Sequence, residues 1–428
     1  MTVVRGRVLT FAFLLAVVTY LDRVCISAAA PAIMEELHLS LQQMGIVFSA
    51  FTLAYSIFEV PSGWLGDVVG PRRVLTRIVL WWSGFTILTA AARGFTSLVA
   101  IRFLFGAGEA GAFPNVARSF SRWFPLRERG RANGVLFLGS RLGGMLSAPI
   151  ALLLIERWGW RVSFVCFGLL GIVWAAAWQA WYRDRPEDHP AMSREELTWI
   201  QQDGPAVSHG DTPWRALLTG ANLYAICAMY FAFGYGLYFY FTWLPTYLIK
   251  ELGFSRFSGG LFAALPFLLA GIADLTGGLI TDRLSRSYGL RVGRCYLGAT
   301  AFAAGALFLL ASTMAVSPVA KAVLIALALA SADLALGACW AVPLDVAPDH
   351  AGVVTGCMNT LGNLGGLVCP LVVAVAVDRW GSWTWPFYIT AAVYASGALC
   401  WLAIDPTERL IASEQNVVEA GREFRQYR

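Results

Sequence analysis

The sequence predicts an all-helical membrane protein with about twelve transmembrane helices in two pseudo-symmetric halves of six. Three observations support this prediction: an apolar composition, the recurrence of long apolar stretches, and an internal repeat. Of the 428 residues, 57% are hydrophobic and only 14% are charged. Soluble domains are about 25% charged. A chain with so few charged residues is suited to placing its surface in lipid, so we do not expect a soluble enzyme.

Long apolar stretches recur along the whole chain. A helix needs about 20 apolar residues to cross the hydrocarbon layer of a bilayer. Because lipid offers no hydrogen-bond partner to a free peptide group, each such span must be helical. The first six predicted spans cover residues 8–30, 43–63, 72–92, 95–118, 132–155 and 160–182. The second six cover residues 220–249, 258–281, 293–313, 317–342, 353–377 and 384–404.

These spans divide the chain into four predicted parts. They are an N-terminal six-helix bundle (1–182), a polar cytoplasmic linker (183–215), a C-terminal six-helix bundle (216–404) and a cytoplasmic tail (405–428). The first apolar run contains Asp22 and Arg23 and is too long for a secretory signal. We therefore expect it to be an uncleaved first span.

Arginines gather in loops that lie on one side of the predicted membrane. These are the loops after spans 2, 4 and 8, whereas the alternate loops, such as 31–42 and 91–95, are poor in arginine. Positive residues favour the cytoplasmic side, so both termini are predicted to be cytoplasmic. The net charge of +5 reflects this asymmetry. It does not indicate a nucleic-acid partner; the expected partner is the lipid bilayer.

Several familiar patterns point to no additional chemistry. The eight cysteines contain no C-x-x-C pair, so neither a disulfide framework nor a metal site is expected. Residues 106–111 read G-x-G-x-x-G, but the stretch lies within a predicted apolar helix and not after a strand. Its glycines are better explained by close helix packing than by dinucleotide binding. A nucleotide-binding loop is absent from the sequence, so ATP is not the expected energy source.

Two features of the first half recur in the second. The sequence from Gly63 to Asp67 matches that from Gly278 to Asp282, and 134–144 matches 356–366. Repeats that share one direction across the membrane commonly enclose a central site near its midplane. The alternative is that the matching glycines arise only because helices pack closely in membranes.

The first repeated motif resembles the loop signature of the major facilitator superfamily. In that signature a glycine and an aspartate precede a pair of basic residues, and a weaker copy follows in the second half. Val68 replaces the basic residue that usually follows the aspartate. The resemblance implies a gating role for Gly63, Asp67, Arg72, Arg73, Asp282 and Arg283.

Four further stretches resemble the anion:cation symporter family, which includes bacterial sugar-acid transporters and animal vesicular and lysosomal carriers of organic anions. They are 20–27, 102–115, 242–247 and 359–363. The resemblance implies the major facilitator fold and transport by alternating access. It also implies a bacterial cytoplasmic (inner) membrane location, a small organic anion as partner, protons as coupling ions and no cofactor. We expect a monomer.

Charged residues inside the predicted spans are the candidate functional residues. A charge near the centre of a span costs about 2.5–3.5 kcal/mol on insertion scales, so such residues need a partner or a role. Arg102 and Glu109 are seven residues apart, which places them on one face of a helix. The charged residues within spans are Asp22, Arg23, Glu59, Arg102, Glu109, Arg141, Asp274 and Asp333.

An exchange of partners among these charges predicts a coupling mechanism. When Asp22 and Glu109 are protonated, Arg23 and Arg102 are released to bind a substrate carboxylate, which suits the planar guanidinium. The resemblance assigns the same roles, with proton coupling at the two carboxylates and anion contacts at the two arginines. It also assigns substrate contacts to Tyr20, Tyr55, Trp340 and Asn359.

Alternatives remain open for these residues. The four charged residues of spans 1 and 4 can instead form a buried ion-pair network that only fixes helix packing. Arg141 is either a third arginine for a dianionic substrate or a packing or gate contact.

The leading functional hypothesis is symport of protons with a sugar acid such as a hexonate, hexuronate or aldarate. An exchanger or uniporter of organic anions without proton coupling is the second hypothesis. A membrane-embedded enzyme or sensor is the third, and it is disfavoured because the linker and the tail are short.

Overall fold

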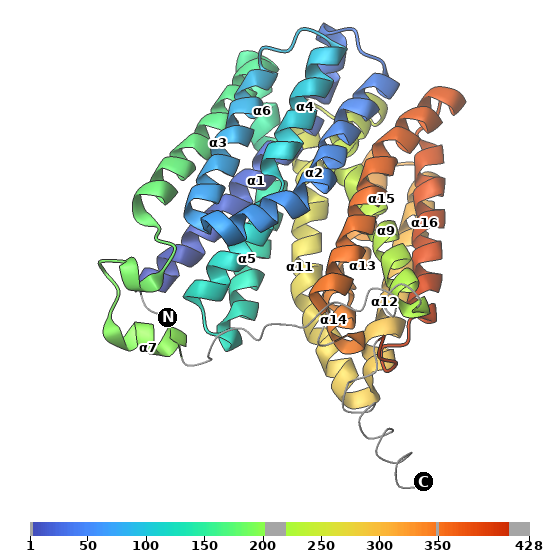
Figure 1. The fold of residues 1–428 in the computed structure, drawn as a ribbon. Coiled ribbons are helices and arrows are strands. Elements are labelled where there is room, and N and C mark those ends of the chain that lie inside the picture. Colours follow the sequence, from blue (N-terminus) through green and yellow to red (C-terminus); the bar gives the residue numbers. More distant parts are fainter. Residues whose placement is uncertain (1–2, 202–219, 348–350, 411–428) are drawn as a thin grey trace.

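The computed structural model describes residues 3–201, 220–347 and 351–410, and the regular elements in these residues are helices (Figure 1). The N-terminal half contains six spans. Helices α4 and α5 form one span that is interrupted at Ala110 and Gly111, and α6 forms two spans that meet at Gly159. The elements are α1 (Val3–Glu36), α2 (Leu41–Val69), α3 (Pro71–Thr89), α4 (Phe95–Glu109), α5 (Ala112–Trp123) and α6 (Leu126–Trp181).

The C-terminal half contains the other six spans among the described residues, and together they confirm the predicted fold class. Three of these spans are built from more than one element. Span 7 comprises α9 (Ala221–Thr242), α10 (Leu244–Thr246) and η2 (Tyr247–Glu251); span 9 comprises η3 (Arg291–Tyr296) and α12 (Leu297–Met314); span 10 comprises α13 (Pro318–Asp333) and α14 (Leu336–Val346). The remaining spans are α11 (Arg256–Tyr288), α15 (Ala351–Trp380) and α16 (Thr384–Ala403).

Nine helical segments of the described chain are long and apolar enough to cross a membrane by length and composition alone. Helix α6 counts once among them although it crosses twice. Helix α3 begins with a polar turn that contains Arg72 and Arg73, and α4 has only 15 residues because the chain breaks after Glu109. These local features explain why fewer segments satisfy the criterion than there are spans.

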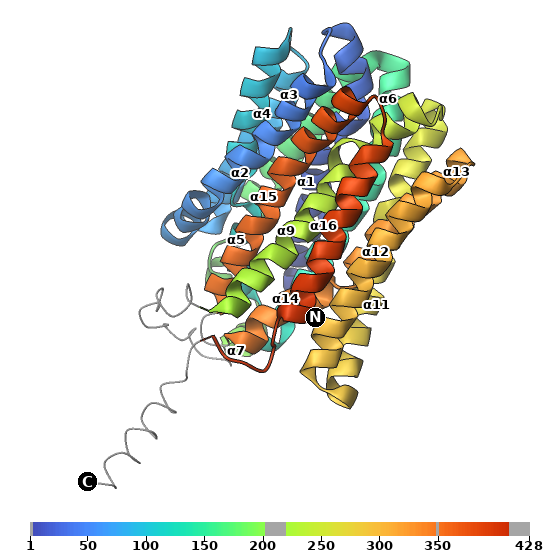
Figure 2. The same ribbon diagram turned by 90° about the vertical axis from the view of Figure 1, so that its right-hand side faces the viewer.

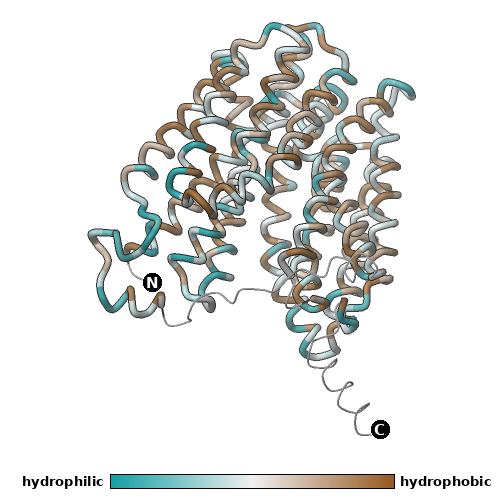
Figure 3. The backbone as a smooth tube through the Cα atoms, viewed as in Figure 1, coloured by the Kyte–Doolittle hydropathy of each residue, from teal (hydrophilic) through white to brown (hydrophobic). Residues whose placement is uncertain are grey.

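The two halves lie side by side (Figure 1). The first residues of α1 and the linker lie at one end of the bundle, which we call the linker end, and we call the opposite end the distal end. Figure 3 shows apolar residues along the helices and hydrophilic residues towards both ends of the bundle, including the linker end. This distribution is expected of a protein whose helices cross a hydrocarbon layer.

The described part of the linker is attached to the N-terminal half. It contains η1 (Pro186–Asp188) and α7 (Arg194–Gln201), and residues 202–219 lie outside the described chain. Buried Arg5 at the start of α1 donates to Glu196 of α7 at 3.0 Å and to Glu128 of α6 at 2.5 Å. The first part of the predicted linker is thereby held against the N-terminal bundle. Of the predicted tail, residues 411–428 also lie outside the described chain.

Close approach of α2 and α15 joins the two halves at the distal end (Figure 2). A Cβ on Gly45 would lie 2.9 Å from the carbonyl oxygen of Pro370, so only glycine fits there without movement. The Ser49 hydroxyl donates to the carbonyl of Leu367 at 2.8 Å. Helices α6 and α11 approach in the same way, since a Cβ on Gly260 would lie 3.1 Å from Cα of Pro149.

The structure differs from the prediction in spans 95–118 and 317–342. Each span was predicted as one helix, and this was wrong because each is interrupted. Gly111 has a φ of +85°, and the residue before it has left the helical region. A Cβ on Gly111 would lie only 2.4 Å from Cβ of Ser62. Asn115 stabilises the turn by donating to the carbonyls of Ser62 and Gly111. The second interruption directly follows Asp333, where α13 ends.

The glycines of residues 106–111 serve helix packing, as predicted. A Cβ on Gly106 would lie 2.3 Å from the carbonyl oxygen of Phe51 in α2, and one on Gly108 would lie 1.8 Å from the ring of Trp81 in α3. Both distances are shorter than any stable contact. The motif therefore brings α4 against two neighbouring helices.

The G111A variant tests the turn between α4 and α5. A left-handed conformation costs a non-glycine residue about 1–2 kcal/mol, and the clash with Ser62 adds to this cost. The matched control is G381A, because Gly381 has a φ of +61° and open space around its Cβ position. We expect G111A to melt at least about 2 °C below G381A in thermal unfolding of the detergent-solubilised protein. Equal melting temperatures would contradict the packing argument.

Candidate functional site

A buried ion pair joins α1 to α4 at the centre of the N-terminal half. Arg23 Nε donates to Glu109 Oε1 at 2.9 Å, and Nη2 of the same guanidinium contacts the same oxygen. Glu109 is 0% exposed. Because a buried charge is costly unless it is paired, each group stabilises the other in this arrangement.

Aromatic rings surround the Arg23 guanidinium. Its Cζ atom lies 5.0 Å from the ring centroids of Tyr20, Phe51 and Tyr55. Arg102 contacts the same Phe51 ring at 5.2 Å. Cation–π contacts of this kind stabilise a cation without neutralising it. The two guanidinium groups can therefore stay charged and available to an anion.

Asp22 differs from Glu109 because no arginine bonds to its carboxylate among the described residues. It is 1% exposed, and neither of its carboxylate oxygens has a hydrogen bond in the described part of the chain. Arg102 interacts with it electrostatically, but its Nε also has no hydrogen-bond partner there. A buried carboxylate without a hydrogen bond is costly in its charged form, so this position favours a neutral, protonated group.

The structure thus brings together the four charged residues that were predicted from spans 1 and 4. Successive residues of a helix point about 100° apart. Helix α1 uses this difference to direct Arg23 to Glu109, while Asp22 interacts electrostatically with both Glu109 and Arg102. The four residues form one buried cluster, which we call the N-half cluster.

Arg141 lies in a second buried cluster, away from those contacts. Its Nε donates to Asp274 Oδ2 at 2.6 Å, and its Nη2 donates to Asp333 Oδ1 at 2.7 Å. Both aspartates belong to the C-terminal half. We call these three residues the inter-half cluster. In this conformation Arg141 connects the two halves, and both of its predicted roles, a substrate contact and a packing or gate contact, stay predictions.

The other predicted substrate residues lie near the boundary between the halves. Tyr20 packs against Phe241 with ring centroids 5.6 Å apart. Trp340 packs against Phe137 at 6.0 Å. Tyr55 lies beside the N-half cluster. Asn359 Nδ2 approaches the carboxylate of Glu59 at 3.4 Å, a long hydrogen bond between α15 and α2.

The first copy of the predicted gating motif contacts the linker. Arg72 donates through its side chain to the carbonyl of Gln179 and through its backbone N–H to Asp184 Oδ1 at 2.9 Å. Gly70, with a φ of +98°, leaves room for Asp184, because a Cβ there would lie 2.8 Å from its carboxylate. Gly63 packs against Pro114.

Arg73 is exposed. The side chain of Asp67 lies outside the described part of the chain.

The second copy of the motif uses a partner that the sequence analysis missed. Arg294 Nη1 donates to Asp282 at 3.3 Å, and its Nε donates to Asp345 at 3.1 Å. Arg283 is exposed. Arg294, Asp345 and Asp184 were not predicted as site residues. Arg294 was used only to predict orientation, and Asp184 was assigned only to the polar linker. The position of Arg294 soon after the second motif was an available signal.

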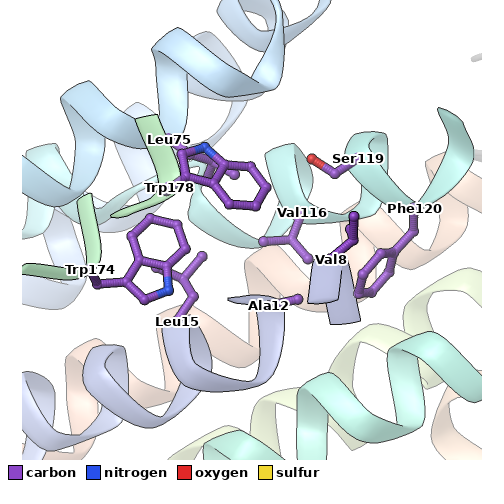
Figure 4. Close-up of a pocket in the computed structure, with 9 residues that line it drawn as sticks. All are labelled: Val8, Ala12, Leu15, Leu75, Val116, Ser119, Phe120, Trp174 and Trp178. Carbon is purple, nitrogen blue, oxygen red and sulfur yellow. The ribbon is translucent and has the colours of Figure 1, made fainter. Parts of the chain in front are cut away.

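A hollow in the N-terminal bundle does not belong to the site (Figure 4). Ser119 is the one polar residue among those that line it, and the space leaves no room for a water molecule. Figure 4 shows apolar side chains from several helices around it, including Trp174 and Trp178. It is a packing defect in an apolar core and offers nothing to bind an anion.

Comparison with known proteins identifies the family. The model of the Major Facilitator Superfamily matches residues 12–370. The chain is 35% identical to a probable sulfoacetate transporter of Cupriavidus necator, with 94% of both chains covered. It is 30% identical to a hexuronate transporter of Bacillus subtilis, covering 92% of this chain and 93% of that protein. It is 32% identical to a probable galactarate/D-glucarate transporter of Escherichia coli, with 94% of both covered.

A solved structure shows the same fold. It is the crystal structure of a bacterial homologue of the human lysosomal transporter Spinster, in an inward-facing and occupied conformation. The TM-score is 0.73 at 18% identity, with 94% of both chains covered. The relatives are transporters, which agrees with the prediction that this chain is not an enzyme. The chain belongs to the major facilitator superfamily, and its relatives agree with the anion:cation symporter family that the sequence motifs predicted within it.

Proposed function

We propose that this protein carries a small organic anion across the bacterial cytoplasmic membrane together with protons, by alternating access. A sugar acid such as a hexuronate or an aldarate is the proposed substrate class. The observation that carries the proposal is the N-half cluster, in which one arginine is held by a buried carboxylate and a second buried carboxylate has no hydrogen bond among the described residues. The relatives named above support it, because their names all refer to transport of small organic acids.

The ion pair between Arg23 and Glu109 supplies the coupling step. While Glu109 is charged, it occupies the guanidinium that an anion would need. A proton on Glu109 removes that competition, and Arg23 can then bind a substrate carboxylate through its planar edge. Anion binding therefore becomes favourable when the proton is bound, which is the requirement for symport.

Neighbouring residues supply contacts for the rest of a sugar acid. The Tyr20 and Tyr55 rings lie beside the Arg23 guanidinium. Their hydroxyl groups can both donate and accept hydrogen bonds. Trp340 and Asn359 of the C-terminal half can add a ring face and an amide. A substrate held by residues of both halves would favour the conformations in which the halves are close.

The proposed orientation assigns a direction to the observed conformation. With the linker end in the cytoplasm, the contacts of Gly45 with Pro370 and of Pro149 with Gly260 close the periplasmic end. No observation favours the proton-free alternative, an exchanger or uniporter. That alternative would leave without a role the buried carboxylate of Asp22, which has no hydrogen bond among the described residues.

The E109Q variant tests proton coupling. Glutamine keeps the size of the side chain but cannot exchange a proton, so uptake driven by an inward proton gradient should be lost. Counterflow, which exchanges labelled for unlabelled substrate, should be retained. The measurement is proteoliposome uptake of galacturonate, glucarate, galactarate and sulfoacetate. The control is E156Q, since Glu156 is exposed near the distal end of α6. Gradient-driven uptake by E109Q at the level of the unmodified protein would refute the coupling role.

The R102K variant tests anion binding. Lysine preserves the positive charge but lacks the planar fork that binds a carboxylate with two hydrogen bonds. Losing one charge-assisted hydrogen bond of about 1.5–3 kcal/mol predicts affinity weaker by roughly tenfold or more. Isothermal titration with the transported acid would measure this, with R93K as the control because Arg93 is exposed. Unchanged affinity would show that Arg102 does not contact the anion.

A further inference from the structure

The inter-half cluster places two carboxylates on one guanidinium. Arg141 uses Nε for Asp274 and Nη2 for Asp333. Both nitrogens are bonded to the same carbon of a rigid planar group, so the two carboxylates are held next to each other. Asp333 is 0% exposed, and the Arg141 and Asp274 side chains are 14% and 20% exposed.

The charges of this cluster do not balance. One guanidinium faces two carboxylates, and Asp274 Oδ1 and Asp333 Oδ2 have no hydrogen bond within the described chain. The other titratable groups that interact with the cluster are Tyr20, Tyr230, Tyr240, Cys339 and Tyr394. Such groups are ordinarily neutral near pH 7. Because an uncompensated buried charge is costly, neutrality requires one proton on the pair of carboxylates.

The two halves of the protein each carry an acid at an interrupted helix. Glu109 is the last residue of α4, and Asp333 is the last residue of α13. These helices belong to spans 4 and 10, which correspond in the internal repeat. Each acid is fully buried and bonded to an arginine of another helix. Arg23, which bonds to Glu109, belongs to the same half as Glu109. Arg141, which bonds to Asp333, belongs to the opposite half from Asp333.

Arg141 lies on a seam that alternating access must disturb. Close contacts between α6 and α11 run from Pro149 and Gly260, through Gly144 and Phe267, to Arg141 itself. A Cβ on Gly271 of α11 would lie 3.7 Å from Cβ of Arg141. When the halves part along this seam, Arg141 moves away with the N-terminal half and leaves both aspartates in the C-terminal half.

We propose that Asp274 and Asp333 form a second proton-binding site, in the C-terminal half, with Arg141 as its removable counter-charge. With Arg141 in place the pair holds one proton, and with Arg141 withdrawn it takes a second proton from solvent, so that both carboxyls are neutral. Acid therefore favours the open seam, and alkali favours the closed one. The inference rests on the alternating access proposed above, but not on proton coupling at Asp22 or Glu109.

Distance measurements across the seam test this site independently of transport. Spin labels carried by non-canonical amino acids at Leu153 and Leu261, both exposed near the distal end, leave the native cysteines in place. Pulsed electron resonance of the full chain in nanodiscs gives the open and closed populations as pH is varied. A linked proton changes their ratio by up to about tenfold per pH unit. The background is D22N/E109Q, so that the remaining pH dependence does not come from the N-half cluster.

We expect the D274N/D333N pair of changes to abolish this pH dependence in that background. R141Q should shift the population towards the open seam, and R141K should restore part of the closed population. The matched control is D378N, because Asp378 accepts a hydrogen bond from Gln42 across the same two halves but is exposed. It should retain the full pH dependence.

A pH dependence that survives in D274N/D333N, or one that follows sodium concentration in place of pH, would overturn the proposal. If the double variant fails to fold, R141Q decides the question. Without the removable counter-charge, the two carboxylates bind the same number of protons whether the seam is open or closed, so the pH dependence should be lost in this variant as well. If Arg141 were only a structural latch, R141Q would change the open population by the same factor at every pH. That result would also overturn the proposal. Failure of proton coupling at Glu109 would appear separately, in the uptake experiment.

Discussion

The cost of a charge inside a membrane-spanning helix is the constraint on which the rest of this structure depends. Arg23 and Glu109 satisfy it within the N-terminal half, whereas Arg141 bonds to two aspartates across the halves and compensates the charge of only one. Several other features follow from the first pair. The break after Glu109 and the close packing of Gly106 bring α4 near enough to α1 and α2 for the carboxylate to reach its arginine. The Phe51 ring contacts the guanidinium groups of both Arg23 and Arg102.

Much of the fold could be predicted because lipid imposes simple rules on sequence. Apolar length identifies spans, and the repeated Gly…Asp motifs revealed the relation between the halves. The helix breaks could not be predicted in the same way. Gly111 adopts its left-handed conformation because Ser62 of another helix lies against it, and this contact is set by tertiary packing. Likewise, α3 and α4 depart from the simple length criterion for local reasons, a polar first turn and an early end.

The candidate site shows the same division. The charged residues of spans 1 and 4 were found because charges stand out in apolar helices. Their pairing was not given by that rule, since Arg23 and Glu109 are 86 residues apart. The partner of Asp282 was missed for a related reason. Arg283 is adjacent in sequence, but the α11 helix directs it to solvent, and Arg294 approaches from the next element.

The approach of Gly45 to Pro370 has a mechanical consequence. Contact between small groups depends on dispersion forces, and a gap of about 1 Å already forfeits up to half of that attraction. The α2–α15 seam is therefore most favourable when it is fully made, and a partial separation loses a large part of the dispersion attraction without gaining a new packing partner. Such a contact favours a closed or a fully separated seam over a partly separated one. Intermediate conformations are therefore disfavoured, which helps to prevent a continuous passage through the membrane.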